Sequence, residues 1–293
     1  YLPIWHYEFE DLVVLKNNKG TEENRVRHMD YAFQLNKLMY ERLLSGGNIT
    51  LFDPNEVPGL YEAFFDDQDK FKELYEKYER AYSIRKKTIP ALEVFQKLLT
   101  ERKDTGRIYV MNVDHANDHG SFIAEEAPIK QSNLCCEINL PTKPLNDIND
   151  KEGEISLCTL SAINWGLISD PKEFEKWCDL SVRALDELLD YQDYPIPAAE
   201  ISTMNRRPLG IGIINLAYFL AKRGLKYDEG AFEIVDEYAE AWSYYLIKAS
   251  ANLAKEKGKI PLNNQTKYAF GDTPNYTYKS AVDNLIEHNE RLP

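Results

Sequence analysis

The chain has 293 residues, a net charge of −13, 43% hydrophobic residues and 28% charged residues. This composition is that of a folded protein with enough chain for one large domain or two small ones. Nineteen tyrosines and twelve phenylalanines argue against disorder, because disordered chains are poor in aromatic residues. The acidic balance argues against nucleic-acid and membrane partners. No apolar run reaches the roughly 18 residues that a membrane span requires.

The four cysteines are too few for a disulfide scaffold, so we expect a reducing, cytoplasmic setting. In that setting a conspicuous cysteine is either buried filler or a reactive thiol. The start, Tyr1-Leu2-Pro3, reads as the inside of a strand or loop, and the end, Leu292-Pro293, has no terminal character. We therefore expect the chain to be a segment of a longer one.

The first part of the chain mixes β-type and helical patterns. Residues 1–16 read as a β-type stretch, followed by a turn at Asn17-Asn18-Lys19-Gly20. Helical spacing of apolar residues predicts a helix over residues 26–44, which Ser45-Gly46-Gly47 stops. Residues 49–52 are typical of a short strand.

The middle of the chain alternates helices and strands. Acidic and aromatic residues over 62–82 indicate surface helices, and Pro90 opens a helix that runs to about Arg102. Residues 107–113 have the composition of a good strand. Extended or β-type segments follow at residues 132–140 and 155–160.

Three helices are predicted in the last part of the chain. The first carries an apolar face of Phe174, Trp177, Ser181, Leu185 and Leu188. The second runs from about Ile213 to Arg223 and is capped by Gly224. The third ends at Gly258 and carries a stripe of Val235, Ala239, Trp242, Leu246, Ala249 and Leu253. Strands that alternate with long helices favour an α/β fold with largely parallel strands, and no linker or repeat divides the chain.

The run Asn133-x-Cys135-x-Glu137 could carry chemistry. In an extended segment these three side chains would share one face, while Leu134 and Cys136 point the other way. A thiol can act as a nucleophile, a redox centre or a hydrogen-atom carrier, a carboxylate as a base, and an amide can hold a substrate hydroxyl. Spacing alone leaves catalysis and packing both open for Cys135, and it favours packing for Cys136.

Other candidate sites are weaker. Cys158, in an apolar run, reads first as a buried cysteine, and Cys178 lies on the core face of a helix beside Trp177 and is structural. A zinc site could take His115, His119, Cys135 and Cys136 as ligands. It is disfavoured because the two cysteines are adjacent, without the residues that usually separate the cysteine ligands of a structural zinc ion. Half of a dinucleotide fingerprint, Leu209-Gly210-Ile211-Gly212, lacks the third glycine and is rejected.

Several motifs in a fixed order resemble the active-site region of class I ribonucleotide reductase large subunits, closest to the bacterial and phage branch. The likeness covers nearly the whole chain. Its central motifs are Ser132-Asn133-Leu134-Cys135-Cys136-Glu137-Ile138, Leu140-Pro141-Thr142 and Leu157-Cys158-Thr159-Leu160-Ser161. Further matches are Val14-Leu15-Lys16-Asn17-Asn18, Arg25-Val26-Arg27-His28-Met29-Asp30-Tyr31, Pro58-Gly59-Leu60-Tyr61, Asn112-Val113-Asp114-His115 and Leu188-Leu189-Asp190-Tyr191-Gln192.

The resemblance implies reduction of ribonucleoside diphosphates to 2′-deoxyribonucleoside diphosphates by radical chemistry. It assigns Cys135 as the thiyl-radical site that abstracts the 3′ hydrogen. Glu137 would take a proton from the 3′ hydroxyl, and Asn133 would hydrogen-bond the substrate. Cys158 would be one of two redox-active thiols. Substrate contacts are implied for Asn133, Leu134, Cys135, Cys136 and Glu137.

The resemblance also implies the fold and the partners. Residues 1–293 would be a segment of the catalytic domain, a ten-stranded α/β barrel with the radical cysteine on a central finger loop. The chain would bind no cofactor or metal, the radical coming from a dimetal small subunit. ATP and deoxynucleotide effectors would bind mainly outside this segment. Further partners would be the remaining large-subunit segments, thioredoxin or glutaredoxin, and a second large subunit in a homodimer.

One departure from the family pattern concerns the second redox cysteine, which the family places upstream of this segment. The C-terminal cysteines and the paired tyrosines that pass the radical are also absent from these residues. We therefore expect the chain alone to be inactive. Two alternatives are a non-catalytic assembly fragment of a split reductase and a thiol-based redox protein unrelated to nucleotides.

Overall fold

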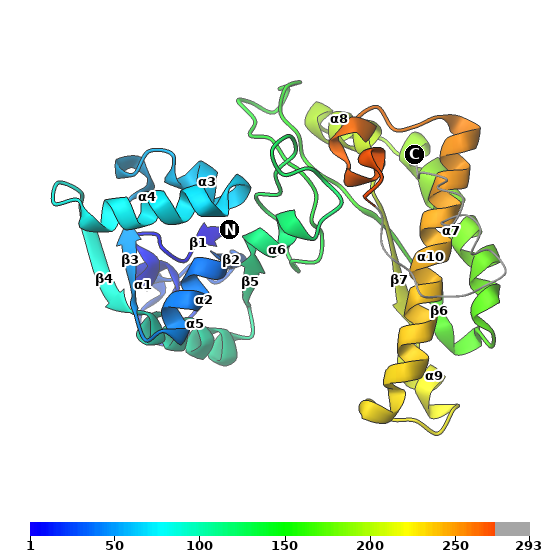
Figure 1. Ribbon diagram of the computed structural model, residues 1–293, viewed down its shortest axis with the longest axis horizontal. Helices are drawn as coiled ribbons and strands as arrows, with labels where there is room; N and C mark the ends of the chain where they lie inside the picture. Colours follow the sequence, from blue (N-terminus) through cyan, green and yellow to red (C-terminus); the bar gives the residue numbers. More distant parts are fainter. Residues whose placement is uncertain (273–293) are drawn as a thin grey trace. The chain divides into compact units, whose positions relative to one another are not determined.

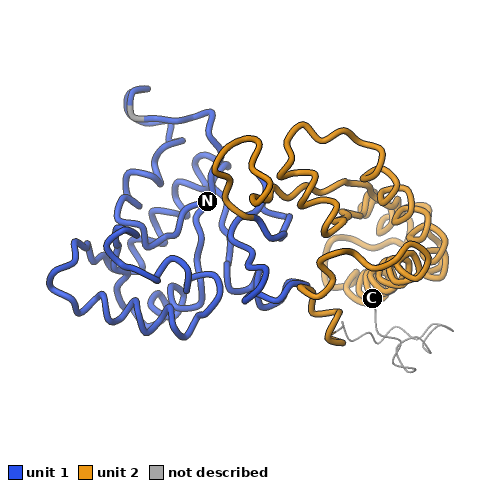
Figure 2. The backbone as a smooth tube through the Cα atoms, turned by 90° about the horizontal axis from the view of Figure 1, so that it is seen from above, with its two compact units in different colours: residues 1–142 blue, residues 143–293 orange. Residues whose placement is uncertain are grey.

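The computed structural model describes residues 1–272. The chain divides into two compact units, residues 1–142 (unit 1) and residues 143–293 (unit 2), which Figure 2 colours separately. Each unit has its own apolar core. No helix in the described part of the chain is both long and apolar enough to cross a membrane.

Unit 1 is built on a parallel sheet of three strands in the order β1-β2-β5 (Figure 1). These are β1 (Leu2–Pro3), β2 (Tyr31–Leu35) and β5 (Ile108–Asn112). All five residues of β2 are buried, as is usual for a central strand covered on both faces. A separate antiparallel pair joins β3 (Asn48–Phe52) to β4 (Lys86–Pro90).

The helices of unit 1 surround an aromatic core. Trp5 lies at its centre, with its ring 5.7 Å from that of Phe64 and 6.1 Å from that of Phe71, and all three are fully buried. Such aromatic contacts bury large apolar areas and fix side-chain geometry. The helices are α1 (Phe9–Leu12), α2 (Lys37–Leu44), α3 (Leu60–Asp66), α4 (Gln68–Arg80), α5 (Ala91–Thr105) and α6 (Val113–Asp118).

Unit 2 joins a two-stranded parallel sheet to long helices (Figure 1). The strands are β6 (Thr159–Asn164) and β7 (Leu209–Ile214), paired from Thr159 opposite Leu209. Helix α7 contacts both strands and α10, and its buried side chains face a core that includes Trp165 and Tyr238. The helices are α7 (Phe174–Tyr191), α8 (Pro197–Arg206), α9 (Leu216–Ala221) and α10 (Phe232–Lys257).

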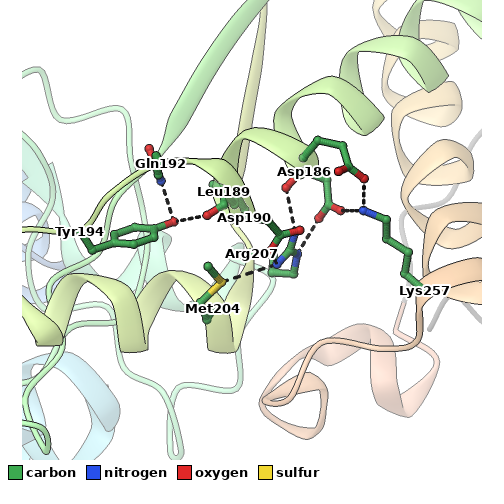
Figure 3. Close-up of polar contacts among 9 residues, drawn as sticks. Asp186, Leu189, Asp190, Gln192, Tyr194, Met204, Arg207 and Lys257 are labelled. Atoms are coloured by element: carbon green, nitrogen blue, oxygen red, sulfur yellow. Dashed lines mark hydrogen bonds and ion pairs between the residues drawn. The ribbon is translucent and has the colours of Figure 1, made fainter.

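A cluster of ion pairs ties α7 to the ends of α8 and α10 (Figure 3). Asp186 is almost fully buried; one carboxylate oxygen lies 2.6 Å from Arg207 Nε and the other 3.0 Å from Lys257 Nζ. Arg207 also reaches Asp190 at 2.8 Å. Burial alone would raise the pKa of Asp186, but the hydrogen bonds from Arg207 and Lys257 outweigh it, so the pKa is lowered. The Asp186 carboxylate is therefore held ionised inside the unit.

Several predictions from the sequence are confirmed. The strand at residues 49–52, the strand within residues 107–113 and the helix that follows Pro90 all lie within a few residues of the predicted bounds. Most paired strands are parallel, as predicted for an α/β fold. Cys178 is fully buried, as predicted for a structural cysteine.

Other predictions are wrong. Residues 1–16 contain only the two-residue strand β1 and then helix α1, and residues 31–35 of the predicted helix 26–44 form β2. In α7 the predicted core residues Trp177 and Leu188 are 42% and 46% exposed, because the buried face is turned toward Cys178, Val182 and Leu189. Strand β6 begins only at Thr159 and helix α9 only at Leu216. The sequence analysis also missed two strands and two helices, namely β4, α6, α8 and β7.

The described residues do not form the closed ten-stranded barrel that the resemblance implies. The described residues 1–272 hold seven strands in one three-stranded and two two-stranded sheets. What the structure contains is therefore a partial α/β arrangement.

Candidate active site

The predicted active-site run folds as a tight turn and not as an extended strand, which corrects the prediction for residues 132–140. The backbone amide of Cys136 donates to the carbonyl of Asn133 at 3.1 Å, and Cys136 takes a left-handed φ of 65°. A turn with such a residue reverses the chain, so the two-residue alternation of a strand does not apply. Asn133, Cys135 and Glu137 therefore lie at a turn and do not share a strand face.

The Asn133 side chain closes this turn. Its Oδ1 accepts hydrogen bonds from the backbone amides of Glu137 (3.1 Å) and Ile138 (3.2 Å). Asparagine is suited to such turns because its short side chain reaches nearby backbone donors. Ser132 supports the same turn, since its hydroxyl donates to the carbonyl of Ile138 at 2.6 Å. The hydroxyl of Tyr1 donates to the carbonyl of Asn133, and burial raises the pKa of that hydroxyl and keeps it protonated.

Two buried amide side chains anchor the segment that leads into the turn. Asn117, in α6, pairs with the backbone of Ile129: its Oδ1 accepts from the amide at 2.8 Å and its Nδ2 donates to the carbonyl at 3.1 Å. Gln34, in β2, donates to the carbonyl of Lys130 at 2.5 Å. The segment is therefore fixed to the sheet and to α6 of unit 1.

The sequence analysis missed both anchors. A glutamine inside the otherwise apolar Tyr31–Leu35 segment is a signal that could have identified Gln34, because a buried amide needs a polar partner. No comparable signal marks Asn117, whose partner lies twelve residues further along the chain.

The exposed and buried sides of the turn differ. Leu134 is 57% exposed, and Cys135 and Glu137 are exposed as well. Cys136 is half-buried, packs against the core of unit 1 and donates weakly from Sγ to the carbonyl of Val110 at 3.7 Å. The packing role predicted for Cys136 is confirmed. The turn thus exposes the Cys135 thiol and the Glu137 carboxylate to solvent, while Cys136 packs against the core of unit 1.

The two remaining cysteines lie in unit 2. Cys158 is half-buried and lies directly before β6. Cys178 is fully buried, and burial raises the pKa of its thiol to about 12. A thiol with so high a pKa stays protonated at neutral pH and is unreactive. All four cysteines of the chain are present as thiols.

The alternative sites weighed from the sequence have no geometric support. Among residues 1–272, no three or more histidine, cysteine or acidic side chains form a group that could hold a metal ion. The rings of His115 and His119 lie 5.4 Å apart, but Cys135 and Cys136 do not join them in such a group. The glycines at 210 and 212 lie within strand β7 and not in a phosphate-binding turn.

Comparison with known proteins identifies the family. Residues 1–292 match the family described as the barrel domain of ribonucleotide reductase. The chain is 59% identical over 288 residues to ribonucleoside-diphosphate reductase subunit alpha of Haemophilus influenzae, covering 98% of this chain and 38% of that protein. It is 58% identical over 293 residues to subunit alpha of reductase 1 of Escherichia coli, covering 100% of this chain and 38% of that protein.

A phage relative is also similar. Subunit alpha of ribonucleoside-diphosphate reductase of Enterobacteria phage T4 is 49% identical over 291 residues, with 97% of this chain and 38% of that protein covered. The chain thus spans about 38% of the length of these curated relatives. This chain belongs to the ribonucleotide reductase barrel-domain family.

Proposed function

We propose that this chain is a catalytic-core segment of a ribonucleoside-diphosphate reductase, which reduces ribonucleoside diphosphates to 2′-deoxyribonucleoside diphosphates. The observation that carries the proposal is the match of residues 1–292 to the reductase barrel domain, supported by relatives named as subunit alpha. The exposure of the Cys135 thiol on the turn, and of Glu137 directly after the turn, is consistent with it.

In the proposed mechanism Cys135 is the radical site. An unactivated ribose C–H bond does not yield to acid or base at neutral pH, so a thiyl radical on Cys135 abstracts the 3′ hydrogen atom. Glu137 takes the proton of the 3′ hydroxyl, and its exposure leaves it accessible to substrate. The oxygen of Asn133 is used by the turn, which leaves its Nδ2 hydrogens to hold the substrate hydroxyl. Leu134 and Cys136 complete the substrate contacts.

Cys158 supplies one of the two reducing equivalents. In the overall reaction two thiols give up two electrons and two protons, the 2′ hydroxyl leaves as water, and a disulfide forms between the two sulfurs. The second thiol comes from the remaining part of the alpha subunit. The Cys135 hydrogen is returned to the 3′ position, so that this thiol is regenerated in each cycle.

The proposed partners follow from this chemistry. A small subunit with a dimetal centre supplies the radical, and thioredoxin or glutaredoxin re-reduces the disulfide. The complete alpha subunit forms a homodimer and binds ATP or deoxynucleotide effectors mainly outside this segment. Alone, the chain lacks the second redox thiol and is inactive.

The test replaces one sulfur atom by oxygen in an assembled reductase that contains this chain, the other alpha-subunit segments and the small subunit. We expect Cys135→Ser to abolish deoxynucleotide formation while nucleotide binding changes less than twofold, because a serine hydroxyl cannot carry the radical. Cys178→Ala serves as the matched control, since that buried thiol takes no part in the reaction. Substantial turnover by Cys135→Ser would contradict the catalytic role and favour the non-catalytic assembly fragment.

A further inference from the structure

The sulfur of Cys158 lies over the α-carbon of Gly210, across the paired strands of unit 2. Leu160, two residues after Cys158, stands opposite Gly210 in the β6–β7 register. A β-carbon built on Gly210 would lie 2.6 Å from Cys158 Sγ and 2.5 Å from Leu160 Cδ2. Both distances are under 3.0 Å, a separation that real β-carbons essentially never show. The space that a side chain at position 210 would fill is therefore already occupied by the thiol and by the Leu160 side chain.

Backbone conformation does not explain the glycine. Gly210 is not among the glycines with positive φ, such as Gly224 and Gly258, and it lies within a regular strand. Glycine in a strand interior costs stability and commonly marks a place where another group approaches closely. Here the approaching groups are the Cys158 sulfur and the Leu160 side chain.

We propose that Gly210 is a positioning residue for the Cys158 thiol. This inference rests on the proposed function, in which Cys158 is one of the two redox thiols. By lacking a β-carbon, Gly210 allows the Cys158 side chain the one rotamer that places its sulfur against β7. Gly210, in the segment that resembles half a dinucleotide fingerprint, thus serves a thiol and not a phosphate.

Because a disulfide requires a narrow range of distances, the position of the Cys158 sulfur affects the rate at which the disulfide forms. The staggered wells of a cysteine side chain are separated by rotations that move the sulfur by about 3 Å. A disulfide requires the two sulfurs at about 2.05 Å and the two β-carbons at about 3.5–4.5 Å. Alanine at position 210 drives the Cys158 sulfur into another well, which takes it out of reach of its partner thiol. The two electrons then pass slowly from the thiols to the ribonucleotide, and water and the disulfide form slowly.

Gly212 provides the control. It lies two residues further along β7, on the same face of the strand. A β-carbon on Gly212 would meet only the backbone oxygen of Ser161, at an ordinary 3.9 Å. Gly212→Ala thus adds the same methyl group to the same strand without touching the thiol.

The experiment uses the assembled reductase, fully reduced and without external reductant. The amounts of deoxynucleotide and of disulfide at Cys158 are followed in a single turnover. We expect Gly210→Ala to slow disulfide formation at least tenfold with the KM for nucleotide within twofold of the unsubstituted enzyme, and Gly212→Ala to change both less than twofold. Equal rates for the two alanine variants would overturn the proposal.

A stability measurement keeps the proposal testable if Gly210→Ala folds poorly. We expect Gly210→Ala to lower the urea midpoint of the assembled alpha subunit less in a Cys158→Ala background than in the unsubstituted protein, because the sulfur that the methyl group meets is gone. Strict additivity of the two changes would overturn the proposal. The non-additive effect of Gly210→Ala and Cys158→Ala on the urea midpoint does not depend on catalysis. Multiple turnovers by Cys158→Ser would instead contradict the redox role of Cys158 and leave this non-additive effect intact.

Discussion

At the scale of single residues, Asn133 has two separable tasks. Its side-chain oxygen holds the turn through the amides of Glu137 and Ile138, and its amide hydrogens are assigned to the substrate. The first task follows from the geometry, and the second belongs to the proposed mechanism. Substitutions that remove one task at a time can distinguish them.

We expect Asn133→Ala to remove the protection of the Glu137 and Ile138 amides and to abolish most activity. Each lost hydrogen bond contributes about 1 kcal/mol to the local opening free energy. Asn133→Asp keeps the accepting oxygen, so that the two amides stay protected while activity falls for lack of the donor. Hydrogen exchange measured on the peptide around residue 135 distinguishes the Asn133→Ala variant from the Asn133→Asp variant. Amides that exchange equally slowly in Asn133→Ala would show that the side chain does not hold the turn.

The chemistry of this site stays a prediction, whereas its predicted shape was wrong. Residues 133, 135 and 137 supply an amide, a thiol and a carboxylate, and spacing alone left both catalysis and packing open for the thiol. The roles were assigned by the family resemblance. The shape was mispredicted because strand alternation was assumed. The left-handed Cys136 and the side-chain bonds of Asn133 override it, and neither is visible in a pattern of apolar and polar residues.

At the scale of elements, the ion-pair cluster in Figure 3 fixes α7 against the ends of α8 and α10. Asp186 and Glu187 are neighbours on α7 and both pair with Lys257, yet the Asp186 side chain is 8% exposed and that of Glu187 66%. Loss of a buried carboxylate that pairs with two cations lowers stability, whereas loss of an exposed ion pair changes it little.

We therefore expect Asp186→Ala to lower the free energy of unfolding by about 2 kcal/mol, a value reduced for the partial exposure of Arg207 and Lys257. Glu187→Ala is the matched control and should give no measurable change. Urea unfolding followed by circular dichroism compares the two. Equal effects of both substitutions would show that burial of Asp186 does not set the strength of the cluster.

The elements themselves were predicted unevenly. Helices with clear stops, such as the one ended by Gly258, were found, because glycine at a helix end is a local signal. Strand β2 was mistaken for helix, because a strand buried on both faces shows no alternation. The close approach of Gly210 to Cys158 depends on the β6–β7 register, which joins segments about fifty residues apart and leaves no local trace.

At the scale of the whole molecule, the two cysteines assigned to the reaction belong to different compact units. Cys135 lies on the turn of unit 1 and Cys158 lies before β6 in unit 2. The proposed mechanism gives them different fates. Cys135 carries a hydrogen atom and is regenerated, while Cys158 is consumed as a reductant until a disulfide reductase restores it.

The fate of each cysteine tests the central claim most directly. The assembled, pre-reduced enzyme is allowed to form deoxynucleotide without external reductant, quenched with an alkylating reagent, and analysed by peptide mass spectrometry. We expect disulfide at Cys158 to rise in proportion to product, while Cys135 is recovered as an alkylated thiol, as is Cys178. Oxidation of Cys135 in proportion to product, with Cys158 still a thiol, would contradict the assignment of Cys135 as the radical site.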